Sequence, residues 1–174
     1  MNSLGPLRAL ALAGLVVASP LSIASVMAAP ADTALLQTYL GSWKGKGKLV
    51  GSESETVACK LNLSPGNGDK VNYEGRCAMA GTNVTVAGSM QYNDANRRYE
   101  AIMSTNVTFS GVAIGKKRGD AIVFNLRERE KDEDGNDLTV TADITLRPAN
   151  IQVDFNVLFN DSGDTLSASV PFTK

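Results

Sequence analysis

Apolar and polar residues alternate with a period of two through most of the chain after residue 42. The clearest run is 151–159, where Ile151, Val153 and Phe155 alternate with polar residues. Successive side chains of a β-strand point to opposite faces, so this pattern predicts strands with one apolar face. Gly, Asn, Asp or Pro interrupts the pattern about every 8 to 14 residues. The interruptions delimit ten predicted strands: 42–50, 54–63, 70–80, 83–92, 98–104, 106–115, 120–129, 137–147, 150–160 and 164–173.

The links between these predicted strands are short, as at 64–69 and 93–97. Short links join antiparallel neighbours, because a parallel crossover needs a dozen or more residues. We therefore expect an all-β fold, an antiparallel up-and-down meander barrel of about ten strands. The leucines and tyrosine of residues 35–40 indicate a short helix before the first strand, which would close one end of the barrel.

The apolar faces also predict how neighbouring strands pair, since a slip of one residue would turn a whole apolar face outward. Folding the second and third strands about residues 64–69 places Cys59 opposite Cys77, within reach of a disulfide. Such a structural bond would stabilise the fold by about 3 kcal/mol. A redox site would need closer spacing and local activation of the thiols. The same construction predicts the pairs Leu63–Tyr73, Leu61–Gly75, Gly88–Met103, Tyr92–Tyr99, Ile144–Val153 and Val140–Val157.

The predicted inner face is almost entirely apolar, with Gly75, Gly88 and Gly111 among larger residues. Side chains nearly fill an eight-stranded barrel, so ten strands leave more room. We expect an apolar cavity that binds a small apolar molecule. The candidate lining residues are Tyr73, Met90, Tyr99, Met103, Phe109, Phe124, Phe155 and Phe159.

The first 28 residues have the pattern of a secretory signal, with Arg8, an apolar run and a small-residue end at Val26–Ala28. Ser19 and Pro20 interrupt the run before it could span a membrane. We expect cleavage after Ala28, export to a bacterial periplasm, and no stable membrane insertion afterwards. Three regions are thus predicted: a signal peptide at 1–28, an N-terminal segment at 29–41 and the barrel at 42–174. In a eukaryotic chain, the sequons at Asn62, Asn83 and Asn106 would instead be glycosylation candidates.

Loss of Arg8 with the signal would leave 16 basic and 18 acidic residues, a net charge of −2. That balance argues against binding to nucleic acid or to an anionic membrane. The sequence indicates no particular protein partner.

Gly41 and Trp43, after a short helical turn and at the start of the first strand, form a Gly-x-Trp motif. This opening resembles that of the calycin superfamily, which includes lipocalins, fatty-acid-binding proteins and nitrobindin-like barrels. The longer run 40–47 is most similar to the nitrobindin-like opening. The resemblance implies that a basic residue from a late strand packs on the tryptophan, and Arg147 or Lys174 has the right position. Haem-binding members use a histidine on the iron, and this chain has none.

The absence of histidine removes the usual general base near neutral pH and the commonest metal ligand. Four charged residues that could act in catalysis, Glu74, Arg76, Glu100 and Asp143, have outward parity. The acidic run 132–137 lacks the glycine and glutamate that an EF-hand needs, so we interpret it as a solvated turn. We interpret the alternating charges of 127–131 as an exposed strand end. We therefore expect no enzyme, no metal site and no cofactor.

Two other functions fit the same pattern. Some small exported protease inhibitors also use a calycin-like barrel with one disulfide, and they act through an N-terminal segment. Here Ala29 to Gln37 would be that segment, protruding and not packed on the barrel. A structural envelope protein with a solid barrel is the other alternative.

Overall fold

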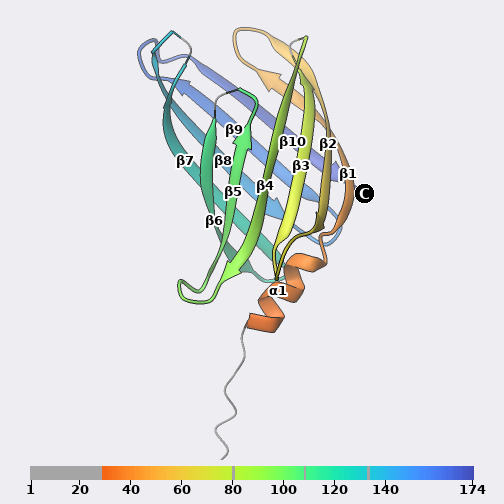
Figure 1. The fold of residues 1–174 in the computed structure, drawn as a ribbon. Helices are drawn as coiled ribbons and strands as arrows, with labels where there is room; N and C mark the ends of the chain where they lie inside the picture. Colours follow the sequence, from red (N-terminus) through yellow and green to blue (C-terminus); the bar gives the residue numbers. More distant parts are fainter. Residues whose placement is uncertain (1–28, 80, 108, 133) are drawn as a thin grey trace, which may run out of the picture.

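The computed structural model describes residues 29–174 except 80, 108 and 133, so the predicted signal peptide lies outside the described residues. One short helix precedes ten strands, and each strand pairs antiparallel with the next (Figure 1). The last strand pairs with the first and closes the barrel. The elements are α1 (Ala29–Gln37), β1 (Gly41–Val50), β2 (Ser54–Pro65), β3 (Val71–Met79), β4 (Thr82–Asn93), β5 (Arg98–Thr105), β6 (Ser110–Arg118), β7 (Ala121–Lys131), β8 (Asp137–Leu146), β9 (Ile151–Phe159) and β10 (Thr165–Thr173). The predicted fold class is confirmed.

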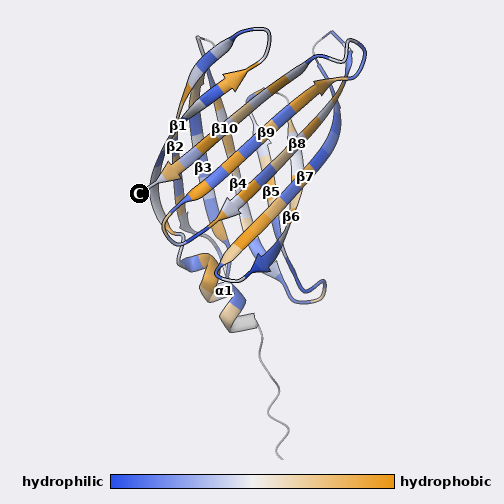
Figure 2. Cartoon of the chain, turned by 180° about the vertical axis from the view of Figure 1, so that it is seen from behind, coloured by the Kyte–Doolittle hydropathy of each residue, from blue (hydrophilic) through white to orange (hydrophobic). Residues whose placement is uncertain are grey.

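The alternation predicted from the sequence is visible along the strands in front in Figure 2, such as β8 and β9, where hydrophobic and hydrophilic positions follow one another. The predicted register is also confirmed, including Cys59 opposite Cys77, Gly88 opposite Met103 and Ile144 opposite Val153. Cys59 and Cys77 form a disulfide between β2 and β3. Both face the interior of the barrel.

The sixth strand begins at Ser110, four residues later than the predicted start at 106. Asn106 instead turns the chain toward β4: its Oδ1 accepts the Thr85 N–H at 2.7 Å and its Nδ2 donates to the Asn83 carbonyl oxygen at 3.0 Å. The Asn106 N–H also donates to the Thr85 carbonyl oxygen at 3.3 Å. These three bonds tie the tip of the β5–β6 hairpin to β4. Residue 80, the predicted end of the third strand, lies outside the described residues.

Helix α1 packs across one end of the barrel (Figure 1). Leu36 and Tyr39 are completely buried there, and Trp43 is 1% exposed. The Trp43 Nε1–H donates to the Tyr39 carbonyl oxygen at 2.9 Å, and the Tyr39 hydroxyl donates to the Asp120 carbonyl oxygen at 3.0 Å. The helix, the start of β1 and the β6–β7 turn are thereby joined. In the described part of the chain, no helix has the length and apolar character to span a bilayer.

Candidate ligand-binding interior of the barrel

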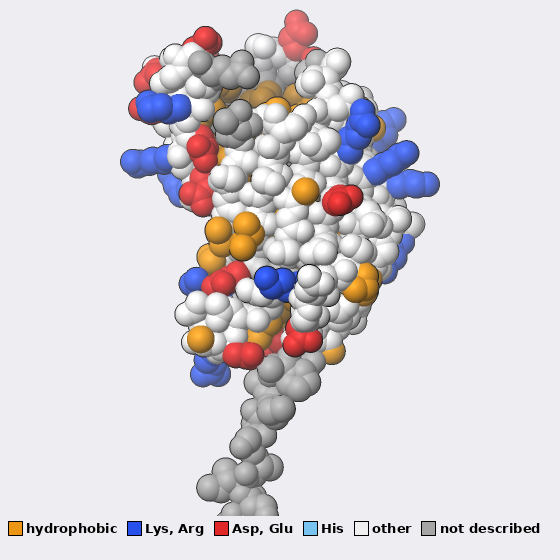
Figure 3. All heavy atoms as spheres, in the orientation of Figure 1, with side chains coloured by type: hydrophobic (Ala, Val, Ile, Leu, Met, Phe, Trp, Pro, Cys, Tyr) orange, Lys and Arg blue, Asp and Glu red, His pale blue; other side chains and the backbone are white. Residues whose placement is uncertain are grey.

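The exposure of inward-facing side chains changes along the barrel. At the α1 end, Trp43, Phe124 and Ile151 are at most 2% exposed. Toward the opposite end, Phe155 and Phe159 also face inward but are only half-buried. In Figure 3, hydrophobic side chains are visible within a hollow at this opposite end, at the top of the view. The barrel is therefore a cup, closed by α1 and open at the other end.

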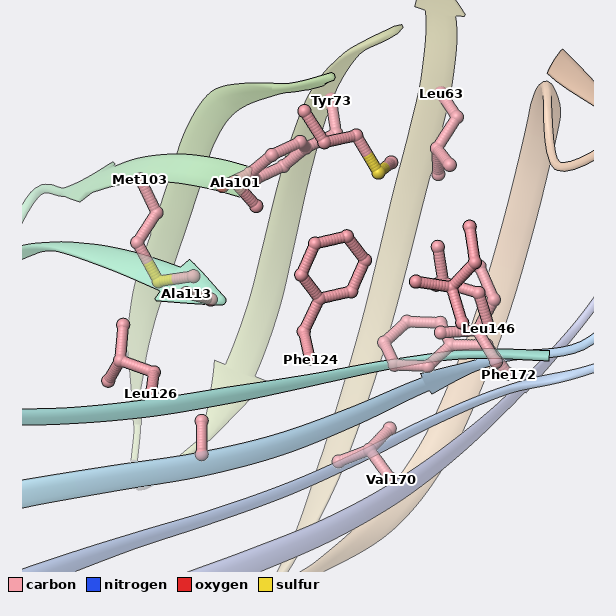
Figure 4. Close-up of a cluster of buried hydrophobic side chains, with 14 of the residues drawn as sticks. Leu63, Tyr73, Ala101, Met103, Ala113, Phe124, Leu126, Leu146, Val170 and Phe172 are labelled. Atoms are coloured by element: carbon pink, nitrogen blue, oxygen red, sulfur yellow. The ribbon is translucent and has the colours of Figure 1, made fainter. Parts of the chain in front are cut away.

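The structure divides the eight predicted lining residues into two groups. Tyr73, Met90, Tyr99, Met103 and Phe124 are buried in the closed half. Figure 4 shows Phe124 pointing into the middle of this cluster, with Tyr73 and Met103 reaching in from other strands. The remaining three, Phe109, Phe155 and Phe159, are half-buried toward the open end. Side chains thus fill the closed half, whereas the inner face of the open half is partly exposed to solvent.

Tyr73 illustrates how the closed half is filled. Its hydroxyl donates to the Ile102 carbonyl oxygen at 2.9 Å, which requires the ring to cross β4. It crosses at Gly88, its direct partner in the ladder, where a Cβ atom would lie 2.6 Å from the Tyr73 oxygen. Burial raises the pKa of Tyr73 well above its usual value, so the phenol stays neutral and acts as a donor.

Polar groups at the closed end are also satisfied. The Tyr99 hydroxyl donates to Asp32 Oδ1 at 3.1 Å, and Lys117 Nζ lies 3.9 Å from the same oxygen. Burial raises the pKa of Tyr99, and the bond to Asp32 adds to this effect. Every buried side-chain nitrogen and oxygen within the described residues has a hydrogen-bond partner. The buried part of the interior therefore offers no free polar group for chemistry.

Two carboxylates that sequence reasoning placed outside lie on the inner face. Glu128 and Glu130 continue the inward parity of Phe124 and Leu126 on β7, and both are half-buried. The interpretation of 127–131 as wholly exposed was therefore wrong for these two residues. The parity counted from Phe124 would have identified them, but their charge suggested solvent. By contrast, Glu74, Arg76 and Asp143 are exposed on the outer face, as predicted.

The wall of the cup is incomplete between β6 and β7. Their ladder extends only from the Arg118–Ala121 pair to the Ile114–Asn125 pair. Beyond it, residues 110–113 pair with β5 alone, and residues 126–131 pair with β8 alone. Side chains close the wall there: a Cβ on Gly111 would lie 2.9 Å from Leu126 Cδ1 and 3.1 Å from Glu128 Cγ. The Val112 N–H, left without a ladder partner, donates to Glu128 Oε1 at 3.5 Å.

The Gly-x-Trp motif lies at the closed end and not in the open half. Gly41 has a φ of +124°, a conformation that favours glycine. Trp43 packs under Lys174, whose Nζ lies 4.8 Å from the ring centroid. Arg147, the other predicted partner, is exposed. The motif therefore supports closure of the barrel.

The acidic turn after β7 is held by its own hydrogen bonds. Asp132 accepts the N–H groups of Asp134 and Asn136 at 3.0 and 2.8 Å, and the Asn136 side-chain amide at 2.9 Å. These bonds lower the pKa of Asp132, with the Asn136 side chain as the main cause. Among the residues whose placement is described, which exclude 133, no group of three or more metal-binding side chains occurs.

The outside of the barrel has two shallow hollows. One, of about 310 Å³, crosses β1, β10, β9 and β8 and is lined by outward residues such as Lys48, Asp143 and Asp154. The other, of about 340 Å³, lies at the open rim beside Arg129, Thr139 and Asn160. Neither contains a predicted lining residue except Phe155, which borders the first.

Comparisons with known proteins support the fold. Neither a protein-family description nor a curated protein sequence matches the chain significantly. Among solved structures, Rv2717c from M. tuberculosis is similar with a TM-score of 0.64 and 14% identity, over 84% of this chain and 98% of that chain. The S-type phycobiliprotein lyase CPES from Guillardia theta is similar with a TM-score of 0.50 and 10% identity, over 80% of this chain and 89% of that chain. These similarities support the closed antiparallel barrel that the calycin resemblance implied.

Proposed function

We propose that the open half of the barrel binds a small apolar molecule. The observation that carries this proposal is the partial exposure of Phe109, Phe155 and Phe159 on the inner face. A ligand that covers the exposed part of an aromatic ring stabilises the complex by roughly 25 cal/mol per Å² of apolar surface removed from water. The closed half would act as a rigid floor because its side chains are buried and hydrogen-bonded.

Within this proposal the protein is a binding protein and not an enzyme. The chain contains no histidine, and the tyrosines of the floor are held neutral by burial. One structural neighbour is named a lyase, so catalysis on a bound ligand is the alternative. The inner carboxylates Glu128 and Glu130 are the residues of this chain that such chemistry would use.

The proposal includes export to a bacterial periplasm after removal of residues 1–28. The signal-like N-terminal sequence supports it, and so does the disulfide, since disulfides persist in oxidising compartments. Mass measurement of the protein from a periplasmic fraction would test both points. A chain that still begins at Met1 and stays in the cytoplasm would contradict them.

The position of α1 weighs against the protease-inhibitor alternative. That function needs an N-terminal segment that protrudes from the barrel. Here Leu36 is completely buried and Asp32 is bonded to Tyr99, so residues 32–36 would have to leave the barrel to enter a protease cleft. Packing of this segment therefore favours closure of the barrel over inhibition.

Native mass spectrometry of protein purified from its own cell tests ligand binding. We expect a bound small molecule that is lost in Phe155→Lys, because Phe155 faces the interior. The matched control is Asn156→Lys, the next residue, whose side chain has the opposite parity. The fluorescent apolar probe N-phenyl-1-naphthylamine should bind wild type and the control but not Phe155→Lys. Absence of both a bound molecule and probe binding in wild type would contradict the proposal.

A further inference from the structure

Three of the four exposed large hydrophobic side chains in the described part of the chain belong to the β5–β6 hairpin. Ile102 is 57% exposed, Val107 55% and Val112 45%. Ile102 and Val112 are direct partners across β5 and β6, and Val107 lies in the loop that joins these strands. Contiguous exposed apolar residues mark an interaction surface more often than single ones do.

Basic residues flank this apolar group on the same outer face. The outward positions of β6 and β7 carry Lys116, Arg118, Arg127, Arg129 and Lys131, and all five are exposed. Within the described residues only Lys131 of these five forms an ion pair, with Asp137 at 2.6 Å. We call the three apolar and five basic residues the β5–β7 face. In Figure 3, blue side chains lie along the left edge of the molecule, and red side chains lie between them and an orange group.

The outward carboxylate within this face is already bound. Glu100 on β5 accepts Arg98 Nε at 2.7 Å and the side-chain amides of Asn93 and Asn96. Glu128 and Glu130 have inward parity, but Glu128 Oε1 accepts the Val112 N–H in the gap between β6 and β7. The β5–β7 face therefore combines exposed apolar residues with an excess of basic ones.

We propose that the β5–β7 face docks on the surface of an anionic lipid bilayer. Peripheral proteins bind such surfaces when exposed apolar side chains enter the boundary of the acyl chains while Lys and Arg contact the headgroups. The near-neutral net charge argued against an anionic membrane, but it averages over all faces of the barrel. A bilayer would contact only one face, so the charges near Ile102, Val107 and Val112 matter more for docking than the net charge of the chain.

The docking face also contains the incomplete wall between β6 and β7. At this gap the side chains of Leu126 and Glu128, and no ladder hydrogen bonds between β6 and β7, separate the interior from the outside. Docking would place the bilayer against the gap. An apolar ligand would then pass between the bilayer and the barrel interior with little exposure to water. This route rests on the proposed function, whereas docking itself does not.

A second basic face provides a matched control. Lys44, Lys46, Lys48 and Lys60 are exposed on the outside of β1 and β2. The ladder between these strands is continuous over ten pairs, and Val50 is the one exposed large hydrophobic residue that β1 and β2 carry. Charge alone would make both faces bind equally, so the two faces separate docking from general attraction.

The test is cosedimentation with vesicles of equimolar phosphatidylglycerol and phosphatidylcholine. The protein is purified from its own cell, and mass spectrometry identifies its N-terminal residue. We expect Arg127→Gln/Arg129→Gln to weaken binding by about thirtyfold, from roughly one tenfold step per 1.4 kcal/mol. Lys46→Gln/Lys48→Gln should stay within about twofold of wild type. Ile102→Ser/Val112→Ser should also weaken binding, and higher salt should weaken it further.

Several results would overturn docking. They are equal losses in the two basic-face variants, no binding of wild type to the anionic vesicles, and equal binding to pure phosphatidylcholine. A short RNA that binds as tightly, with no effect of Ile102→Ser/Val112→Ser, would also overturn it in favour of a polyanion site. Thermal unfolding of each variant excludes loss of the fold as the cause. Vesicle binding without a bound interior molecule would contradict only the proposed function.

Discussion

The Nζ atom of Lys174 lies 4.8 Å from the centroid of the Trp43 ring. Trp43 is near the start of β1, and Lys174 follows β10, the strand that closes the barrel against β1. At its edge, the indole donates its Nε1–H to the Tyr39 carbonyl oxygen at 2.9 Å. Trp43 thus joins the N-terminal helical segment, the first strand and the end of the last strand.

Lys174→Gln should lower the free energy of unfolding by about 0.5–1 kcal/mol, because it removes the cation above the indole face. Urea unfolding followed by the fluorescence of Trp43, the one tryptophan in the chain, measures this change. Lys44→Gln is the control, since Lys44 is exposed on the outer face of β1. Equal effects of both substitutions would show that the contact with Trp43 contributes nothing.

Gly88→Ala should destabilise the barrel by about 3 kcal/mol, near the upper range for added volume in a packed site. The new methyl group would overlap the Ile102 carbonyl oxygen and press on the Tyr73 hydroxyl. Both atoms belong to the hydrogen bond that fixes Tyr73 over β4. Thermal and urea unfolding would measure the loss, with Ser89→Ala on the outer face as the control. Wild-type stability in Gly88→Ala would mean that β4 and β5 can separate freely.

Stability should fall above pH 10 because of the buried tyrosines. The pKa of Tyr73 is raised in the folded state above its ordinary value of 10.0, so the unfolded chain loses this proton first. The stabilisation is complete below pH 10 and is lost as the pH rises toward the folded pKa. Urea midpoints between pH 9 and 11.5 should decrease more steeply for wild type than for Tyr73→Phe. Parallel slopes would contradict a raised pKa at this residue.

The register of this barrel was predictable because each strand has one apolar face. A slip of one residue between β2 and β3 would have turned Leu61 and Leu63 outward, so Cys59 had to meet Cys77. The same argument placed Tyr92 opposite Tyr99, which the structure shows as an edge-to-face pair with centroids 5.0 Å apart. Turn residues such as Gly68 and Gly163, both with positive φ, marked the hairpins in the sequence.

Other features depend on three-dimensional arrangement that a period of two does not encode. Glu128 and Glu130 lie inside because β7 keeps its alternation to the rim, although their charge indicated an exposed strand end. Val107 and Phe109 continue a strand pattern, but the side chain of Asn106 takes the chain out of the ladder. The division of the predicted lining into a buried floor and a half-exposed wall depends on how the barrel tapers toward α1.

Asn106→Ala should alter the gap between β6 and β7. The three hydrogen bonds of Asn106 hold the β5–β6 hairpin against β4, on the side away from β7. Without the side chain, the hairpin tip is free to move toward β7 and extend the ladder past Ile114. We therefore expect slower hydrogen exchange at the Val112 amide, which now has only a 3.5 Å bond to Glu128, and faster exchange at Thr85.

Hydrogen exchange followed by NMR would measure both amides in one experiment, with amides of the continuous β1–β2 ladder as the internal reference. The loss of the side-chain bonds should cost about 1 kcal/mol, equivalent to roughly fivefold faster exchange at Thr85. Glu128→Gln is the companion variant, since it weakens the acceptor of the Val112 N–H without moving Asn106. Unchanged protection at Val112 in Asn106→Ala would show that the bonds from the Asn106 side chain to β4 do not hold β6 and β7 apart.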